Sequence, residues 1–280
     1  MNTAREFGGT PVLGAIAGIL IINPALADIT LFGNPLVPGR GGLIGAMLAA
    51  WLMVWFEKRF RKFVPNAVDI LITPLLTILT VGILTLIVVQ PVAGYISDGI
   101  TSGVIWLLDF GGPVVGAILA GFFLPLVMLG LHQGLTPIHL ELINTIGSTP
   151  LLPVLAMAGA GQVGAAIAIL VKTKNKRLKN VISNALPVGF LGIGEPLIYG
   201  VTLPLGRPFI SSCLGAAVGG AFQAWMGTAA SAIGVSGLPL MALIVDNKIF
   251  IYILGLIITY IAGFLFTYFW GFKEEMADNI

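Results

Sequence analysis

One acid stands out in GFLGIGEPLIYG, residues 189–200, a segment that is otherwise apolar, small or helix-breaking. Glu195 has no basic residue within ten positions on either side. An ionisable side chain at membrane depth is costly and normally faces a bundle interior or a cavity. Gly194 before it allows unusual dihedral angles, and Pro196 after it disfavours helical geometry at Glu195. The segment therefore predicts a helix broken at the acid, with the carboxylate aimed at a cavity.

Two other environments stay open for Glu195. It could be a loop acid just above the membrane, or it could pair with Arg207 across a hairpin. The pairing is compatible with a binding role, because Arg207 could orient the carboxylate beside a ligand.

Two histidines, His132 and His139, lie in HQGLTPIHLE with Glu141 two positions further on. A neutral imidazole suits hydrogen bonding to a polar solute, since one ring nitrogen donates and the other accepts. A metal site of these three residues is an alternative, but no further histidine completes it and Pro137 disrupts a helical face. Packing in a satisfied polar core is the third possibility.

Residues 159–164, GAGQVG, fit the dinucleotide fingerprint G-x-G-x-x-G. The real motif needs a preceding strand and an acid about 20 residues later. Here the run lies in an apolar segment and the next acid is Glu195. We therefore interpret the glycines as close helix–helix contacts.

The whole chain is too apolar for a water-soluble fold of its length. Of its 280 residues, 57% are hydrophobic and 9% are charged, and the mean hydropathy is +1.02. Soluble domains carry about 25% charged residues. We predict an all-α polytopic membrane protein, with roughly six to eight membrane segments of about 20 residues each.

Apolar runs and Gly/Pro-rich breaks divide the chain. The stretch 94–110 is mixed and predicts an interfacial amphipathic helix, and 132–150 is polar and broken by Gly and Pro. The apolar segments are expected at 11–27, 41–56, 69–93, 111–131, 151–171, 181–208, 209–235 and 249–270.

Two basic clusters, at 57–62 and 172–180, are expected to face the cytoplasm. That requires an even number of crossings between them, whereas three plain apolar segments lie there. The broken region 132–153 is the best candidate for a re-entrant passage. Irregular backbone at membrane depth is tolerated only inside protein or beside a watery cavity, so we predict a cavity beside 132–150.

Two motifs carry a resemblance to a known family. GLHQGLTPIHLE (130–141) and GIGEPLIYGVTLPLGRPF (192–209) closely resemble the membrane IIC component of sugar phosphotransferase-system permeases of the glucose superfamily. The resemblance covers most of the chain. LLPVLAMAGAGQVGAA (151–166) and EPLIYGVTLPLGRPF (195–209) look most like the N-acetylmuramic acid permeases, with trehalose, sucrose and β-glucoside permeases as further relatives.

The resemblance implies a homodimeric, multi-pass transporter of the bacterial inner membrane. Residues 1–130 would form the remaining part of a scaffold and dimerisation region, 131–270 a sugar-binding transport region with re-entrant hairpins, and 271–280 a soluble tail. By the same resemblance, His132 and Glu195 contact sugar hydroxyls.

The implied reaction is phosphorylation of the sugar, usually at its 6-hydroxyl, by a phosphocysteine of a IIB component that a IIA component supplies. Glu195 would also polarise the attacking hydroxyl as the catalytic group. We expect His139, Glu141, Asn144 and Arg207 to add substrate contacts. The expected partners are the sugar, IIB, IIA and the lipid bilayer, and we expect no cofactor, no metal and no nucleic acid.

The chain departs from the family in two ways. Family members typically carry further membrane segments before GGTP and often a fused IIB domain, so we expect an N-terminally shortened permease completed by an upstream portion or a split partner. The alternatives from other classes are a proton- or ion-coupled secondary sugar transporter, and an inactive fragment of a related trehalose, sucrose or β-glucoside permease.

Overall fold

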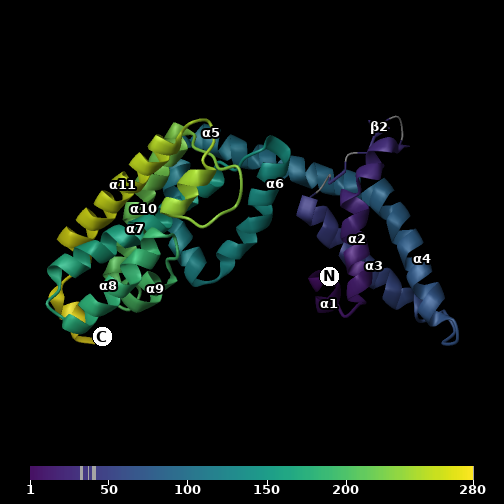
Figure 1. The fold of residues 1–280 in the computed structure, drawn as a ribbon, viewed down its shortest axis with the longest axis horizontal. Helices are drawn as coiled ribbons and strands as arrows, with labels where there is room; N and C mark the ends of the chain where they lie inside the picture. Colours follow the sequence, from purple (N-terminus) through teal and green to yellow (C-terminus); the bar gives the residue numbers. More distant parts are fainter. Residues whose placement is uncertain (32–33, 37, 40–41, 280) are drawn as a thin grey trace. The chain divides into compact units, whose positions relative to one another are not determined.

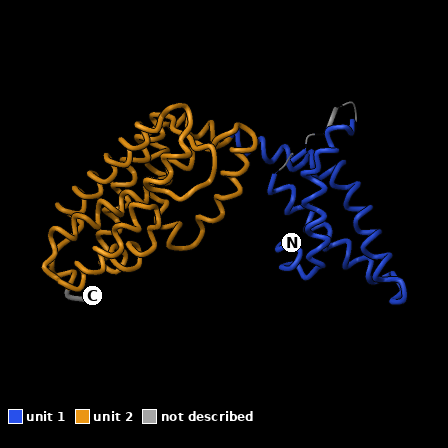
Figure 2. Tube along the Cα trace, in the orientation of Figure 1, with its two compact units in different colours: residues 1–102 blue, residues 103–280 orange. Residues whose placement is uncertain are grey.

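The computed structural model describes residues 1–280 except 32–33, 37, 40–41 and 280. It divides into two compact units, residues 1–102 and 103–280 (Figure 2). The described chain is helical apart from two short strands, β1 (Thr30–Leu31) and β2 (Asn34–Pro35), which pair antiparallel. The predicted all-α class is therefore confirmed, with this small addition.

Unit 1 is built around α2 and α3, which pack their apolar faces together. Leu13, Ala17 and Ile21 of α2 are buried against Ala49 and Met53 of α3. The helical elements that begin in this unit are α1 (Asn2–Glu6), α2 (Pro11–Ile22), η1 (Pro24–Asp28), α3 (Gly42–Phe60), α4 (Asp69–Leu84), η2 (Thr85–Val89) and α5 (Gln90–Met128).

A polar cluster closes the end of α3. Glu57 is 2% exposed. It accepts hydrogen bonds from the backbone nitrogen and the hydroxyl of Thr10 and from Arg61. Arg61 also pairs with Asp69 at 3.1 Å. Glu57, which belongs to the first basic cluster of the sequence, thus has hydrogen-bond partners for its carboxylate. Through Thr10 and Arg61 it connects the start of α2 to the turn between α3 and α4.

The stretch from Asp69 to Met128 is one run of 60 helical residues with two irregularities. A π-turn occupies 85–89, and Gly112 takes a left-handed φ of 45° that kinks α5. The mixed stretch 94–110 is part of α5. At ~1.5 Å per residue the run measures about 90 Å, well beyond one span of about 30 Å.

Unit 2 surrounds α7, which is its most buried helix. α10 and α11 lie beside it (Figure 1). Its helical elements after α5 are η3 (Leu131–Leu135), α6 (Thr136–Ile146), α7 (Leu151–Lys172), α8 (Lys176–Phe190), α9 (Glu195–Leu197), η4 (Ile198–Thr202), α10 (Arg207–Met226), η5 (Leu238–Leu243), α11 (Ile249–Phe266), η6 (Thr267–Gly271) and η7 (Glu274–Asn279).

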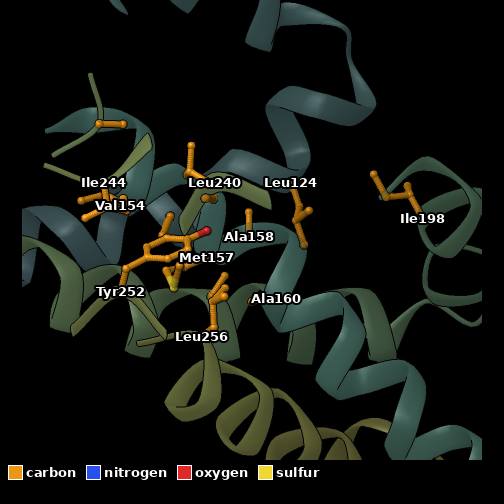
Figure 3. Close-up of a cluster of buried hydrophobic side chains, with 14 residues drawn as sticks. Leu124, Val154, Met157, Ala158, Ala160, Ile198, Leu240, Ile244, Tyr252 and Leu256 are labelled. Atoms are coloured by element: carbon orange, nitrogen blue, oxygen red, sulfur yellow. The ribbon is translucent and has the colours of Figure 1, made fainter. Parts of the chain in front are cut away.

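Apolar side chains from these helices form the core of unit 2. Figure 3 shows Tyr252 beside Met157 in a cluster that also holds Leu240 and Leu256. The Tyr252 hydroxyl donates to the Gly237 carbonyl at 2.8 Å, so even this buried polar atom is satisfied. The core fixes the loop after α10 against α7 and α11.

Glycines set the close approach of α7 to its neighbours. A Cβ on Gly161 would overlap backbone atoms of Ser212 and Ala216 on α10, and one on Gly164 would overlap the Tyr260 carbonyl of α11. These two glycines of the fingerprint-like run therefore serve helix packing, as predicted. Gly159 differs, because a Cβ there would make only an ordinary contact, 3.7 Å from the Ser236 hydroxyl oxygen.

Four helical stretches in the described part of the chain are long and apolar enough to cross a membrane: Asp69–Met128, Leu151–Lys172, Arg207–Met226 and Ile249–Gly271. A multi-pass membrane protein agrees with this finding, while the count of six to eight segments stays a prediction. The apolar segment expected at 209–235 is shorter than predicted, because Gly227 ends α10 in a left-handed conformation (φ 59°).

The boundary between the compact units lies at 102/103, whereas the sequence predicts a functional boundary at 130/131. Residues 103–128 pack with unit 2 by this division, and the functional boundary stays a prediction. The tail 271–279 is not loose: Phe272 and Ala277 are each 1% exposed, and Lys172 donates to the Phe272 carbonyl at 2.8 Å.

Candidate functional site: a polar-lined cavity in unit 2

A cavity of about 430 Å³ opens within unit 2. Its volume lies in the range of small-molecule sites, about 300–1,000 Å³. It is enclosed by the end of α5, by η3, by α7, by the turn after α8 with the following α9 and η4, and by the loop after α10. The lining residues are Phe123, Leu124, Val127, His132, Gln133, Leu152, Leu155, Ala156, Ala158, Gly159, Gln162, Gly192, Ile193, Gly194, Glu195, Ile198, Gly234, Val235 and Ser236.

Glu195 reaches this cavity because the helix breaks just before it. α8 ends at Phe190, a turn follows, and Glu195 is the first residue of α9. Gly192 takes φ 87°, and a Cβ there would overlap the Ser236 carbonyl. The predicted break at the acid is confirmed. Glu195 lines the cavity and is exposed, and its carboxylate makes no hydrogen bond or ion pair within the described residues.

His132 lines the same cavity from the 3₁₀ turn η3, which follows Gly130 in a left-handed conformation (φ 73°). The Gln133 amide nitrogen lies 3.1 Å from its Nε2. With Nε2 accepting from that amide, the neutral ring carries its proton on Nδ1. Nδ1 is buried without a partner and is therefore a free donor. Phe123 holds the ring in an edge-to-face contact at 6.2 Å between centroids.

The sequence analysis did not select Gln162, Gln133 or Ser236, which also line the cavity. Gln162 lies in the middle of α7 and is fully buried. A signal was present, since Gln162 is the one uncharged polar side chain in an otherwise apolar helix. Ser236 carried no comparable signal. It reaches the cavity from an irregular loop, where its hydroxyl donates to the Gly192 carbonyl at 3.0 Å.

Four other predicted site residues lie outside the lining of this cavity. His139 is buried in α6, with its Nδ1 2.9 Å from the Thr149 hydroxyl, and Glu141 accepts from Thr145 at 3.3 Å. The remaining two, Asn144 on α6 and Arg207 at the start of α10, are exposed. No ion pair joins Arg207 to Glu195 within the described residues.

The cavity therefore combines an acceptor, a donor and apolar walls. Glu195 is its one charged residue among those described, and a carboxylate accepts strongly from hydroxyl groups. In the part of the chain that the structure describes, no three His, Cys, Asp or Glu side chains come together as metal ligands. The arrangement suits an uncharged solute rich in hydroxyls, held by hydrogen bonds inside an apolar shell.

The long apolar helices are those of a polytopic membrane protein, and the cavity beside its broken helices is a candidate site for a small solute. A sequence model described as "Phosphotransferase system, EIIC" matches residues 1–216. The chain belongs to this family.

Curated relatives give the finer similarity. The chain is 60% identical over 277 residues to "Putative PTS system EIIBC component YbbF" of Bacillus subtilis, covering 99% of the chain and 61% of that protein. It is 51% identical to "PTS system MurNAc-GlcNAc-specific EIIBC component" of Staphylococcus epidermidis (92% and 56%). It is 54% identical to the protein of the same name in Staphylococcus haemolyticus (91% and 55%).

The chain thus spans less than two thirds of the length of these relatives. No solved structure matches it.

Proposed function

We propose that this chain is the membrane permease component of a phosphoenolpyruvate-dependent sugar phosphotransferase system, and that it binds and translocates an N-acetylated sugar of the N-acetylmuramic acid type. The family membership and the printed names of the relatives support the class of protein and the class of sugar. In this proposal the chain acts in the bacterial inner membrane as a homodimer, and works with IIB and IIA components.

The observation that carries the proposal is the meeting of Glu195 and His132 at one cavity, each with free polar atoms. The two residues are 63 positions apart in the sequence and come from two separate helix breaks. A sugar loses its water when it enters such a cavity, and each unpaired polar group then costs about 1–3 kcal/mol. The Glu195 carboxylate and the His132 Nδ1–H replace part of that hydration.

Glu195 also serves the proposed chemistry. The sugar hydroxyl oxygen attacks the phosphorus of the IIB phosphocysteine, the S–P bond breaks, and the sulfur leaves as a thiolate. The hydroxyl proton passes to the Glu195 carboxylate. Phosphoryl transfer depends mostly on positioning and electrostatics, so the larger part of this role is to hold the hydroxyl in line.

The remaining predicted site residues differ in whether their polar atoms already have partners within the protein. His139 and Glu141 already have intramolecular partners, so in this proposal they support α6 rather than touch the sugar. Asn144 and Arg207 stay as predicted contacts for a part of the sugar that extends beyond the cavity.

The test is sugar uptake and phosphorylation in cells that supply IIB and IIA, with Glu195→Gln and His132→Ala. Loss of a general base costs about 100-fold or more, so we expect at least that decrease for Glu195→Gln, and a smaller one for His132→Ala. The matched control is Glu275→Gln, the same chemical change at an exposed site in η7, which should retain wild-type activity. Normal phosphorylation by both site variants would refute the assignment.

The same cells separate the proposal from a proton-coupled carrier. Deleting the general phosphotransfer proteins should abolish uptake, because the permease needs a phosphorylated IIB. Uptake that persists after this deletion, and collapses with the proton gradient, would favour the carrier. Uptake that never appears, even with partners supplied, would favour the inactive fragment.

A further inference from the structure

Gln162 is the buried amide of unit 2 whose polar atoms have no partner among the described residues. It is 0% exposed, and neither its Oε1 nor its Nε2 has a hydrogen-bond partner. The residue lies on the face of α7 that lines the cavity. Its Oε1 would lie 2.7 Å from a Cβ at Gly194, so the amide is next to the backbone that carries Glu195.

An unpaired buried amide is costly, because each lost hydrogen bond leaves a desolvated group. Gln223 on the neighbouring helix α10 is a buried glutamine whose hydrogen bonds are made within the protein. Gln223 is also 0% exposed, but its Nε2 donates to the Tyr252 carbonyl at 3.1 Å and its Oε1 accepts from Thr228 at 2.5 Å. Gln90 of α5 in unit 1 is also buried without a partner, but it lies outside the lining of the cavity. Gln162 combines unpartnered polar atoms with a place in that lining, which indicates that a ligand completes its hydrogen bonds.

The free atoms define the chemistry of that ligand group. Gln162 presents a donor and an acceptor side by side, whereas the Glu195 carboxylate only accepts and the His132 Nδ1–H only donates. A secondary amide is the complement of such a pair, since its N–H meets Oε1 and its carbonyl meets Nε2. The surroundings fit the rest of an acetamido group: Gly159 lines the cavity without a side chain, and Ala158 and Leu155 offer an apolar wall for the methyl.

We propose that Gln162 binds the 2-acetamido group of the sugar and thereby selects N-acetylated sugars over sugars with a 2-hydroxyl. This inference rests on the proposed function, because it assigns one substituent of the proposed substrate to one side chain. It divides the site into hydroxyl contacts at Glu195 and His132 and an acetamido contact at Gln162.

The test is binding of N-acetylglucosamine and of glucose to the purified chain by calorimetry, in wild type and in Gln162→Leu. Two lost hydrogen bonds in a buried site correspond to about tenfold or more in affinity. We expect wild type to prefer N-acetylglucosamine by at least that factor, and Gln162→Leu to bind the two sugars within about threefold of each other. His132→Ala is the control: it should weaken both sugars and preserve their ratio.

A second measurement needs no variant. The 2-acetoxy analogue keeps the carbonyl and methyl but replaces N–H by oxygen, so it should bind wild type about five- to tenfold more weakly than the acetamide. Equal binding of ester and amide, or an unchanged sugar ratio in Gln162→Leu, would overturn the role of Gln162 while the proposed function stands. A wild-type chain that binds neither sugar would overturn both.

Discussion

Glu57 in unit 1 and Glu195 in unit 2 are both carboxylates in a very apolar chain, and their surroundings are opposite. Glu57 is buried at the end of α3, where Thr10 and Arg61 donate three hydrogen bonds to it. Glu195 follows a helix break and lines a cavity, without an intramolecular partner in the described residues. The Glu57 carboxylate makes its hydrogen bonds within the fold, whereas the Glu195 carboxylate has no partner among the described residues and is available, in our proposal, to a ligand.

The same contrast separates two further pairs of identical residues in unit 2. His139 is bonded to Thr149, while His132 keeps Nδ1 free at the cavity. Gln223 is fully bonded, while Gln162 is not bonded at all. Glu195, Gln162 and the Nδ1 atom of His132 have no partner among the described residues, and these three residues line one cavity. Gln90 of α5 is also buried without a partner, but it lies outside this lining. In the proposed site, an unpartnered polar atom together with a place in the cavity lining, rather than residue type, distinguishes the proposed ligand-binding groups from the structural ones.

The carboxylates should show this contrast most strongly. Glu57→Ala removes one side of a buried hydrogen-bonded cluster, and it should cost about 2–3 kcal/mol, less than breaking a fully buried ion pair because Arg61 is half-exposed. Glu195→Ala should change stability by less than about 0.5 kcal/mol, as at surface positions without partners. Apparent melting temperatures of the detergent-solubilised variants would measure both, and equal shifts would contradict the comparison.

Lowering the pH should reduce the difference in stability between wild type and Glu57→Ala in the same measurement. Glu57 lies beyond the apolar segment 41–56. Burial on its own would raise its pKa, but the hydrogen bonds from Thr10 and Arg61 outweigh burial and hold the pKa below the ordinary 4.5. A depressed pKa adds stability that is complete above about pH 4.5 and declines as pH falls through the folded pKa. The difference between the two proteins should therefore shrink at low pH.

Local chemistry explains which parts of the site were predictable from the sequence. The helix break at Glu195 was predictable, because Gly192 and Gly194 allow unusual dihedral angles and Pro196 disfavours helical geometry at the residue before it. The cavity beside His132 followed from the parity of the basic clusters and from the glycines and proline after it. The glycines and prolines of both signals lie within a few residues of the feature that they predict, whereas the parity argument uses basic clusters tens of residues away.

Long-range packing explains what the sequence did not reveal. Gln162 faces the cavity because Gly161 and Gly164 bind the other sides of α7 to α10 and α11, which no short pattern encodes. The exclusion of His139 from the cavity depends on Thr149, whose backbone is held by Ala230 in the loop after α10. The kink at Gly112 likewise depends on a backbone angle that composition does not report.

Replacing each of the two buried glutamines of unit 2 by leucine should affect the stability of the protein differently. Gln223→Leu leaves the Tyr252 carbonyl and the Thr228 hydroxyl without this partner, and it should lower stability by about 1–2 kcal/mol. Gln162→Leu removes a buried amide that has no partner, so it should leave the ligand-free protein unchanged or slightly more stable. Melting temperatures measured without sugar provide the comparison. A lower melting temperature for Gln162→Leu would mean that the fold itself uses this amide.

The histidines should give the smallest difference in stability and the clearest division of roles. His139→Phe fills a similar volume but leaves the Thr149 hydroxyl without its 2.9 Å partner, so it should cost about 0.5–1.5 kcal/mol. Sugar affinity should stay near wild type, because His139 does not line the cavity. His132→Phe should do the reverse, with little change in melting temperature and a clear loss of affinity. If His139→Phe weakened sugar binding as much as His132→Phe, α6 would belong to the binding site after all, and the partnered histidine would be a ligand contact.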